Sequence, residues 1–199
     1  MKFSVASLAL IALVTLLLLS QPHTASAQTF TNGGAGKEPA SLKAGVSFVW
    51  LSENDSQGLM FSNNFSHYLG KRLSLGLNLG LLSAKRYDDA KQIYTIQNTF
   101  FMGSVDAAFD VMQAEIVTFR LGAGPSFRHR AEINSDPEGQ GTIDGSVTHI
   151  KTSDIGLHGF LENDFGILRN GVAGGRISYF HYKEGTPILS IGLHLGFKF

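Results

Sequence analysis

Cysteine is absent from this chain of 199 residues. Its absence excludes a disulfide framework, a thiolate metal site, a cysteine nucleophile and a lipoprotein anchor. An excess of charge of one sign is missing too, because 16 Lys and Arg residues balance 16 Asp and Glu residues. The sequence therefore indicates neither the basic surface of a nucleic-acid-binding protein nor an acidic tail, and we expect no nucleic-acid partner.

Long apolar runs are missing after residue 27. Residues 1–27 are interpreted as a cleaved signal peptide: Lys2 supplies the positive charge, residues 5–19 the apolar core and Ala25-Ser26-Ala27 the cleavage site. An uncleaved membrane anchor is the alternative, but the apolar core is short for a spanning helix and Pro22 follows it. Because no later run approaches roughly 20 apolar residues, the mature chain either is soluble or crosses a membrane as strands.

Glycine and phenylalanine are abundant, at 23 and 15 residues. The last twelve residues alternate without a slip between an apolar face and a small or polar face. The apolar face carries Leu189, Ile191, Leu193, Leu195, Phe197 and Phe199, and the other carries Ser190, Gly192, His194, Gly196 and Lys198. A period of two predicts a strand with one apolar side.

The same alternation predicts seven further strands between residues 42 and 183. The eight predicted strands cover residues 42–51, 59–69, 73–83, 96–111, 116–130, 151–165, 172–183 and 188–199. Residues 28–41 are predicted to be a flexible leader. In residues 59–69, Asn63 and His67 fall on the apolar face, which suggests a bulge. Short turns on one side and longer polar loops on the other predict an all-β, antiparallel, up-and-down barrel over residues 42–199.

The polar face decides between a transmembrane barrel and a secreted, soluble, lipocalin-like barrel. A face exposed to water should be rich in Lys, Glu, Thr and Gln, whereas this one carries Ser74, Gly76, Asn78 and Gly80 in one strand. Small residues suit the crowded interior of a narrow barrel, which a ring of Leu and Phe would overfill. We therefore expect the apolar face to point to lipid, with the soluble barrel as the alternative.

The terminal motif Leu195-Gly196-Phe197-Lys198-Phe199, together with the eight alternating strands, resembles the small eight-stranded outer-membrane β-barrels of the OmpA transmembrane domain and OmpX-like family. The resemblance implies a bacterial outer-membrane location, contact with lipid, a monomer, and contacts made through exterior loops. It implies that the barrel assembly machinery reads Phe197 and Phe199 as a signal. It also implies that the protein has no catalytic activity and no cofactor.

Six polar residues have inward parity and lie at similar heights on their strands. They are Asn78, Asp106, Arg120, Glu162, Arg176 and His194. Buried charges need partners, so we expect Glu162 to lie beside Arg120 or Arg176, on the neighbouring strands. A structural plug of ion pairs is the favoured interpretation of this layer. A narrow channel or a small-ligand site is the alternative.

Two further features lie at the long-loop ends. Trp50, Tyr179 and Tyr182 are predicted to form an aromatic girdle at a lipid interface. The longest predicted loop, residues 131–150, is polar and free of core constraint, so it is the expected contact surface for an extracellular ligand.

A hydrolase similar to the outer-membrane lipid A deacylases is the remaining alternative. In those enzymes a serine lies two residues after a histidine, and residues 176–181 are similar to that region. However, Lys183 stands where His181 would need the serine, and no acid follows Glu184. Without the nucleophile the covalent step is missing, so we expect no catalysis. The seven histidines show no spacing typical of a metal site.

Overall fold

A computed structural model describes residues 40–51, 56–88, 93–114, 116–134, 148–167, 170–183 and 186–199. The chain divides into two units, Met1–Gly36 and Lys37–Phe199. The predicted signal peptide and residues 28–39 of the predicted leader lie outside the described residues. Within the described ranges, no helix is long and apolar enough to cross a membrane.

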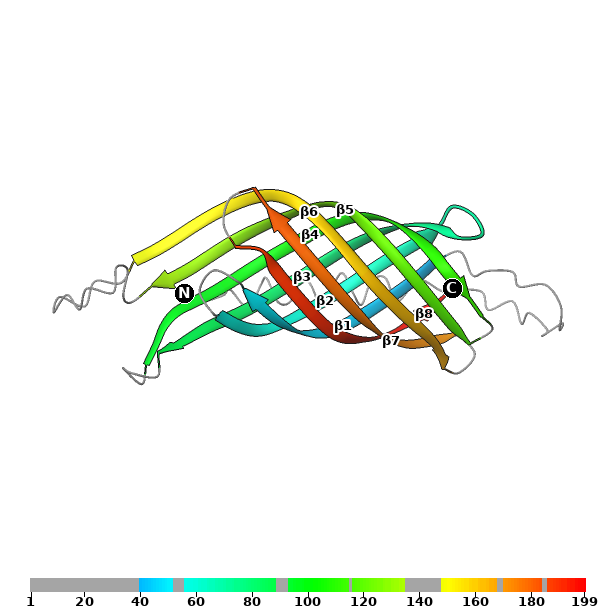
Figure 1. Ribbon diagram of the computed structural model, residues 1–199, viewed down its shortest axis with the longest axis horizontal. Coiled ribbons are helices and arrows are strands. Elements are labelled where there is room, and N and C mark those ends of the chain that lie inside the picture. The colour runs from blue at the N-terminus through cyan, green and yellow to red at the C-terminus, as the bar shows by residue number, and fades with distance from the viewer. Residues whose placement is uncertain are drawn as a thin grey trace, which may run out of the picture. The chain divides into compact units, whose positions relative to one another are not determined.

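Eight antiparallel strands form a closed barrel in which each strand pairs with the next and β1 pairs with β8 (Figure 1). The strands are β1 (Ala40–Leu51), β2 (Ser56–Tyr68), β3 (Leu73–Asp88), β4 (Ile93–Gln113), β5 (Val117–Asn134), β6 (Thr148–Ile167), β7 (Gly171–Tyr182) and β8 (Ile188–Lys198). The up-and-down barrel predicted from the alternation is confirmed. Its ends are joined by two backbone hydrogen bonds between Ala40 and Phe199, with N···O distances of 3.0 and 2.9 Å.

Several predicted boundaries are wrong. Ala40 and Ser41 belong to β1 and not to a leader, because their backbones pair with β2 and β8. Residues 131–134 extend β5 and residues 148–150 extend β6, so the predicted loop 131–150 is shorter at both ends. Its central residues, 135–147, lie outside the described part of the chain. Polar composition near a loop does not end a strand while backbone pairing to its neighbour continues.

The predicted bulge in β2 is also wrong. The register of β2 with β1 and with β3 runs without a shift, and Asn63 and His67 simply point outward among apolar neighbours. Register shifts occur instead in β3–β4 at Arg86/Tyr87 and in β4–β5 at Asp110/Met112. Asn63 and His67 are therefore polar residues on the outer face of a regular strand, and they do not indicate a change of backbone geometry.

The barrel is closed with a stagger. Pairing followed once around the barrel from Gln57 returns to the same strand at His67, a shift of ten residues. Such a stagger tilts all strands relative to the barrel axis, and eight tilted strands leave an interior that side chains can just fill. The contents of that interior consequently determine what the barrel can do.

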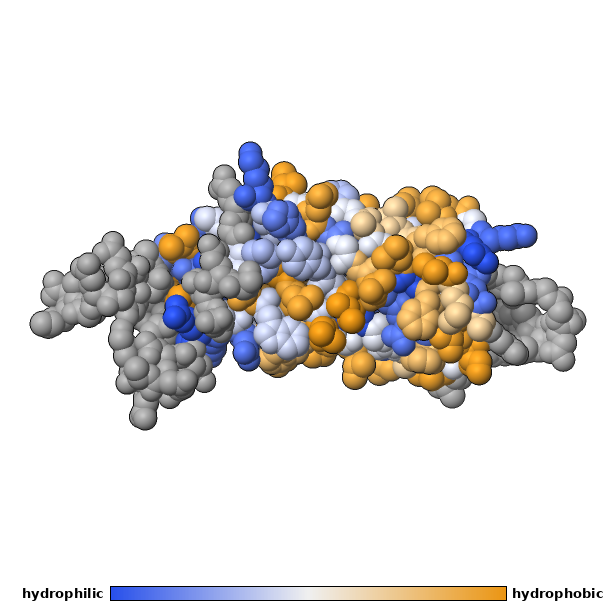
Figure 2. All heavy atoms as spheres, in the orientation of Figure 1, coloured by the Kyte–Doolittle hydropathy of each residue, from blue (hydrophilic) through white to orange (hydrophobic). Residues whose placement is uncertain are grey.

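The two faces of each strand meet different surroundings. In β3, Leu75, Leu77 and Leu79 are exposed on the outer wall, whereas Ser74 is buried in the lumen. On the face that Figure 2 shows, hydrophobic side chains gather over the half of the barrel nearer the C-terminus, with more hydrophilic residues toward the other end. The predicted assignment, with the apolar face of each strand outward and the small or polar face in the lumen, is therefore confirmed.

Glycines on the inner face leave room for other side chains. A Cβ added at Gly192 would lie 2.1 Å from the Ser47 hydroxyl oxygen. One added at Gly174 would lie 2.7 Å from Nε2 of His194. Both distances are far below van der Waals contact, so the glycines make space for polar side chains in the narrow lumen.

Candidate functional site: the filled lumen

The lumen contains two groups of buried side chains. The first, here called the charged network, comprises Lys43, Asp106, Asp110, Arg120, His158, Glu162, Asp164, Arg176 and His194. The second, here called the apolar plug, comprises Val49, Leu51, Met60, Leu82, Ala84, Phe100, Met102, Phe180, Tyr182 and Ile188. On β1, Lys43 lies near the end that pairs with the C-terminus, and Val49 and Leu51 lie near the opposite, loop end. The two groups thus fill different levels of one lumen.

Glu162 is the centre of the charged network. Its Oε1 accepts from Lys43 Nζ at 2.6 Å and from Arg120 Nη1 at 2.7 Å, and its Oε2 accepts from Arg176 Nη1 at 3.3 Å. These cations come from β1, β5 and β7, so the carboxylate joins strands on both sides of its own. Lys43 also donates to Asp164 Oδ2 at 2.6 Å. Glu162 was expected beside Arg120 or Arg176; it contacts both, and Lys43 adds a third cation.

Asp106 is a second point of convergence. Its Oδ1 lies 2.9 Å from Nδ1 of His158, and its Oδ2 lies 3.6 Å from Arg176 Nη2. Asn78 donates to the same carboxylate and accepts from Arg176 Nη1 at 3.2 Å. Arg176 therefore links Asp106 to Glu162, and one polar cluster extends across β3, β4, β6 and β7.

The network extends toward the short turns through Arg120. Its Nε donates to Asp110 Oδ1 at 2.8 Å, and the Tyr68 hydroxyl donates to Oδ2 of the same carboxylate at 3.0 Å. On the β8 side, His194 Nε2 lies 2.7 Å from Asp164 Oδ1. The network's three cations, Lys43, Arg120 and Arg176, thus face four carboxylates, two of which also contact a histidine. Such close balance is what buried charges require.

All six residues of the predicted polar layer lie in the lumen and have polar contacts with one another or with network residues. Sequence reasoning missed Lys43, Asp110, Asp164 and His158. All four have inward parity, which was the available signal. The predicted layer was restricted to one height, and long side chains connect several heights.

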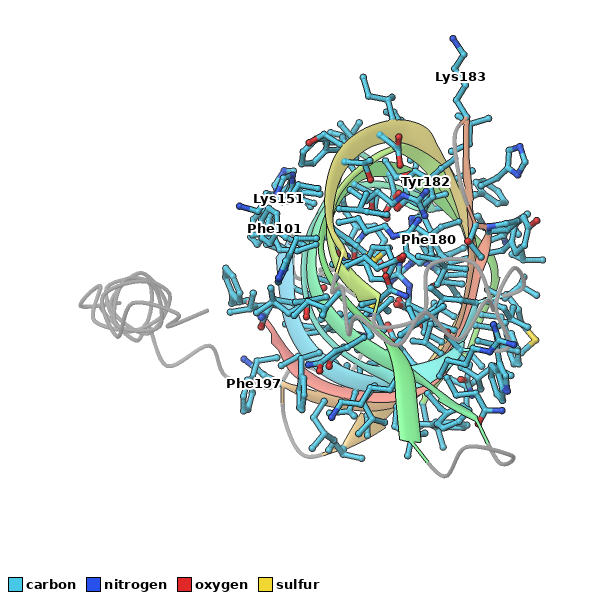
Figure 3. The ribbon with its side chains drawn as sticks, turned by 90° about the vertical axis from the view of Figure 1, so that its left-hand side faces the viewer. Phe101, Lys151, Phe180, Tyr182, Lys183 and Phe197 are labelled. Atoms are coloured by element: carbon cyan, nitrogen blue, oxygen red, sulfur yellow. The ribbon has the colours of Figure 1, made fainter. Side chains whose placement is uncertain are left out.

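The apolar plug is built from inward-facing residues whose neighbours in sequence face lipid. Figure 3 shows Phe180 and Tyr182 pointing into the barrel and Phe101 pointing out. The Phe180 ring stacks on His158 with centroids 4.2 Å apart and planes at 8°. Arg128 covers the ring of Tyr182 at 4.1 Å and bonds Asp154 Oδ2 and the Thr186 carbonyl, both at 2.9 Å. A charged residue held by its own partners thus packs against the plug.

The predicted girdle needs one correction. Trp50 and Tyr179 are 37% and 50% exposed on the outer wall, and both pair with Leu189. Tyr182, by contrast, is only 2% exposed and belongs to the plug. Residues three apart in a strand point to opposite faces, so Tyr179 and Tyr182 could not both face lipid. At the other end of the barrel, Phe197 and Phe199 are exposed.

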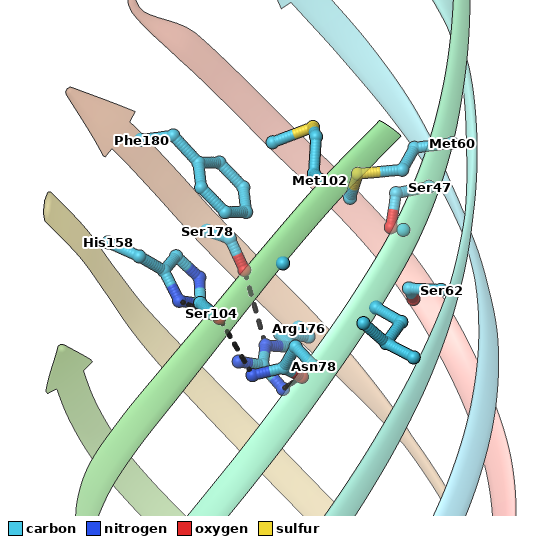
Figure 4. Close-up of a pocket in the computed structure, with 13 residues that line it drawn as sticks. Ser47, Met60, Ser62, Asn78, Met102, Ser104, His158, Arg176, Ser178 and Phe180 are labelled. Carbon is cyan, nitrogen blue, oxygen red and sulfur yellow. Dashed lines mark hydrogen bonds between the residues drawn. The ribbon is translucent and has the colours of Figure 1, made fainter. Parts of the chain in front are cut away.

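A cavity of about 40 Å³ separates the network from the plug (Figure 4). Ser104, His158 and Arg176 line it on one side, and Met60 and Met102 line it on the other. Its volume suits a few water molecules and not an organic ligand. His158 Nε2 and Arg176 Nη2 have no hydrogen-bond partner among the described residues, and water is a suitable partner for both.

One cluster has the donor set of a metal site. Glu162, Asp164 and His194 each place a ligand atom within 4.8 Å of the others. However, Lys43 Nζ lies 2.6 Å from both carboxylates. The ammonium group therefore already provides the positive charge that a metal ion would bring.

A Ser–His–Asp set also occurs in the lumen, but its geometry differs from that of a hydrolase. The Ser104 hydroxyl and Asp106 Oδ1 lie 3.2 and 2.9 Å from the same atom, Nδ1 of His158. A catalytic triad uses both ring nitrogens, one for the serine and one for the carboxylate. On the outer wall, His181 is exposed and Lys183 is the residue two positions on, as in the sequence.

Comparison with solved structures assigns the fold. No protein-family model and no curated protein matches the chain. Neisserial surface protein A matches at 14% identity and a TM-score of 0.57, over 84% of this chain and 100% of that one. The Yersinia pestis attachment invasion locus protein Ail, solved with the heparin analogue sucrose octasulfate, matches at 15% identity and a TM-score of 0.55, over 82% and 99%.

The N-terminal β-barrel domain of Pseudomonas aeruginosa OprF matches at 14% identity and a TM-score of 0.53, over 83% of this chain and all of that domain. The three proteins share the closed architecture with this chain but little of its sequence. The chain accordingly has the fold of the small eight-stranded outer-membrane β-barrels.

Proposed function

We propose that this chain is an integral outer-membrane barrel with a structural or interaction role, carried out through the loops at its extracellular end. The observation that carries the proposal is the outer wall. Leucine, isoleucine, valine and phenylalanine are exposed on all eight strands, while six Asp and Glu side chains of the strands are in the lumen. In water such a wall would be an apolar patch far larger than soluble monomers carry, whereas lipid would bury it.

A closed lumen supports the structural role over the narrow channel. The charged network and the apolar plug lie one after the other along the barrel, and the cavity between them holds only about 40 Å³. An ion crossing the lumen would have to separate the ion pairs of Glu162 and also displace Phe180 and its apolar neighbours. Both steps cost several kcal/mol.

The loop end supports the interaction role. β4, β5 and β6 have 21, 18 and 20 residues, against 11 for β8 and 12 for β1 and β7. The long strands therefore project beyond their neighbours and carry the connection at residues 135–147 (Figure 1). Ail, a protein of the same fold, is an attachment protein solved with a heparin analogue. We infer that this projecting end contacts an extracellular partner.

Three further expectations accompany the proposal. The resemblance implies a monomer without catalysis or cofactor, exported by a cleaved signal peptide. The side chains of Phe197 and Phe199 are exposed, as the proposed role of these residues as an assembly signal requires. Deletion of Phe199 also removes its two backbone hydrogen bonds with Ala40, so the role would be supported if outer-membrane levels in cells fall more than stability in detergent does.

Membrane fractionation and a heat-modifiability gel test the proposal. We expect the chain in the outer-membrane fraction, with different migration before and after boiling. Planar-bilayer recordings of the same preparation should show little or no current. Recovery in the soluble fraction would reject the membrane barrel, and steady currents from the folded protein would reject the closed lumen.

A further inference from the structure

The outer wall of the described residues carries charge of only one sign. Every Asp and Glu whose side chain is described within a strand points into the lumen: Asp106, Asp110, Glu132, Asp154, Glu162 and Asp164. Lys151 and Lys183 point outward, as Figure 3 shows. With His129, His149 and His181 they form one group on β5, β6 and the end of β7, here called the basic collar.

The basic collar spans three neighbouring strands. Lys151 pairs with Ala131, His129 pairs with Ser153, and His181 pairs with Leu157. The Lys183 backbone N–H donates to the Ile155 carbonyl at 3.4 Å. Lys151, Ser153 and Ile155 follow one another on the outer face of β6, so the collar runs along the outer face of these strands, with Lys151 and Lys183 on different sides of the barrel end (Figure 3).

The collar lies directly beyond the apolar belt. Ile155 and Leu157, which continue the outer face of β6 after Lys151 and Ser153, are 73% and 67% exposed. Tyr179 precedes His181 on the outer face of β7 and is half exposed. If the belt is in the hydrocarbon, the collar is at the depth of the headgroups on the loop side.

The two lysines differ from the cations of the lumen. Lys43, Arg120 and Arg176 each contact at least two carboxylates, whereas neither Lys151 nor Lys183 makes an ion pair within the described ranges. Both ammonium groups are exposed, and long lysine side chains can reach along a membrane surface. Both ammonium groups are therefore available to an anion outside the described part of the chain.

We propose that the basic collar binds the phosphate groups of anionic membrane lipids in the loop-side leaflet. This inference rests on the proposed insertion of the barrel in a membrane. A basic residue beside an anionic lipid surface gains about 1 kcal/mol, which is about a five-fold preference for each lysine at low salt. Headgroup phosphates also accept hydrogen bonds from ammonium and imidazole N–H groups.

The single tryptophan provides the probe. Trp50 faces outward at the loop end and is two strands away from the collar, because Trp50 pairs with Leu189 and Leu189 pairs with Tyr179. The full chain is folded into mixed phosphatidylcholine and phosphatidylglycerol vesicles. Quenching of Trp50 by brominated phosphatidylglycerol is compared with quenching by brominated phosphatidylcholine, at low salt and again with added sodium phosphate or 0.5 M sodium chloride.

The parent should prefer phosphatidylglycerol by about five-fold or more, and salt should weaken the preference. The Lys151→Gln/Lys183→Gln variant should lose most of it, and the remainder belongs to Lys85, which is exposed on the outer face of β3 and is also two strands from Trp50. The control, Lys71→Gln/Lys198→Gln, removes the same charge near the short turns and should retain it. Competition by phosphate beyond that of chloride at equal ionic strength would show that free phosphate reaches the same groups.

Failures of the two proposals are distinguishable. If neither brominated lipid quenches Trp50 and the protein is not heat-modifiable, the barrel is not in the membrane and the proposed function fails first. If both lipids quench Trp50 equally in the parent, or if the double variant keeps the parent's preference, the collar does not bind lipid phosphates.

Discussion

The charged network and the apolar plug fill one lumen by opposite means. In the network, Glu162 is held by three cations from three strands, and each contact depends on the sign of charge. In the plug, Val49, Leu82 and Ile188 are buried by apolar packing. The comparison shows that one narrow interior can be closed either by pairing or by packing.

The difference has a consequence for replacement by side chains of equal volume. A neutral side chain of the same size breaks the network, because the cations around it lose their counter-charge. A different apolar side chain of similar size leaves the plug packed, because dispersion contacts are not specific to one residue. Replacement at constant volume therefore separates the two mechanisms.

The largest expected effect is that of Glu162→Gln. The change keeps the volume but leaves Lys43, Arg120 and Arg176 with less negative charge, so the free energy of unfolding should fall by about 3–5 kcal/mol. Urea unfolding of the barrel, monitored by the heat-modifiability gel, measures the loss of unfolding free energy. Glu132→Gln is the control, because Glu132 is paired with Arg130 near the loop rim. A loss no larger than that of the control would contradict the central role of Glu162.

The second-largest effect is expected when a charge is placed on the outer wall. Leu77→Arg places a cation on the lipid face of β3, at a cost of roughly 2–4 kcal/mol near the midplane. Asn78→Ala, on the adjacent inward position, removes hydrogen bonds and should cost about 1 kcal/mol. Folded yield in lipid vesicles measures both. Equal yields would contradict the assignment of the two faces.

The fold could be predicted because alternation is a local property. In β3 and β8 every second residue is apolar over many positions, and a single register satisfies both faces. The exact strand ends could not be predicted in the same way. Residues 131–134 and 148–150 are polar or charged for the most part, and they stay in strands because residues 131–134 pair with both β4 and β6 and residues 148–150 pair with β5.

The candidate site was predicted in part. Parity placed Glu162 and the arginines in the lumen, but it did not show that Lys43 reaches Glu162 across the barrel, since those residues are 119 positions apart. The plug had an unused signal. At the loop ends both faces of a strand are apolar, as in Phe48-Val49-Trp50-Leu51, which indicates lipid on one side and packed apolar side chains on the other.

A smaller effect is expected for Leu82→Met. Leu82 is fully buried in the plug, and methionine has a similar volume and a flexible side chain, so the loss of stability should stay below about 1.5 kcal/mol. Leu82→Asn, which keeps the number and branching of the side-chain heavy atoms, would bury an amide without a partner and should cost more. Urea unfolding ranks the two variants. A methionine variant as unstable as the asparagine variant would show that the plug requires one particular shape.

The smallest effect is expected where the two regions meet. His158 contacts Asp106 with Nδ1 and stacks on Phe180 with its ring, while its Nε2 has no partner in the described residues. His158→Phe keeps the stack and removes the unpartnered nitrogen. Asp106 loses one hydrogen bond but keeps Asn78 and Arg176. The expected loss is therefore about 1 kcal/mol or less.

His158→Ala is the matched comparison, because it removes the ring from both regions and leaves a cavity. Its cost should be clearly larger, on the order of the 3–5 kcal/mol seen when a buried aromatic side chain is truncated. Urea unfolding of both variants measures the two losses of stability. If the two variants were equally unstable, His158 would act through Asp106 and would belong to the charged network alone. A stable phenylalanine variant would instead show that packing against Phe180 is its main contribution, and that the boundary between the two regions passes through this one ring.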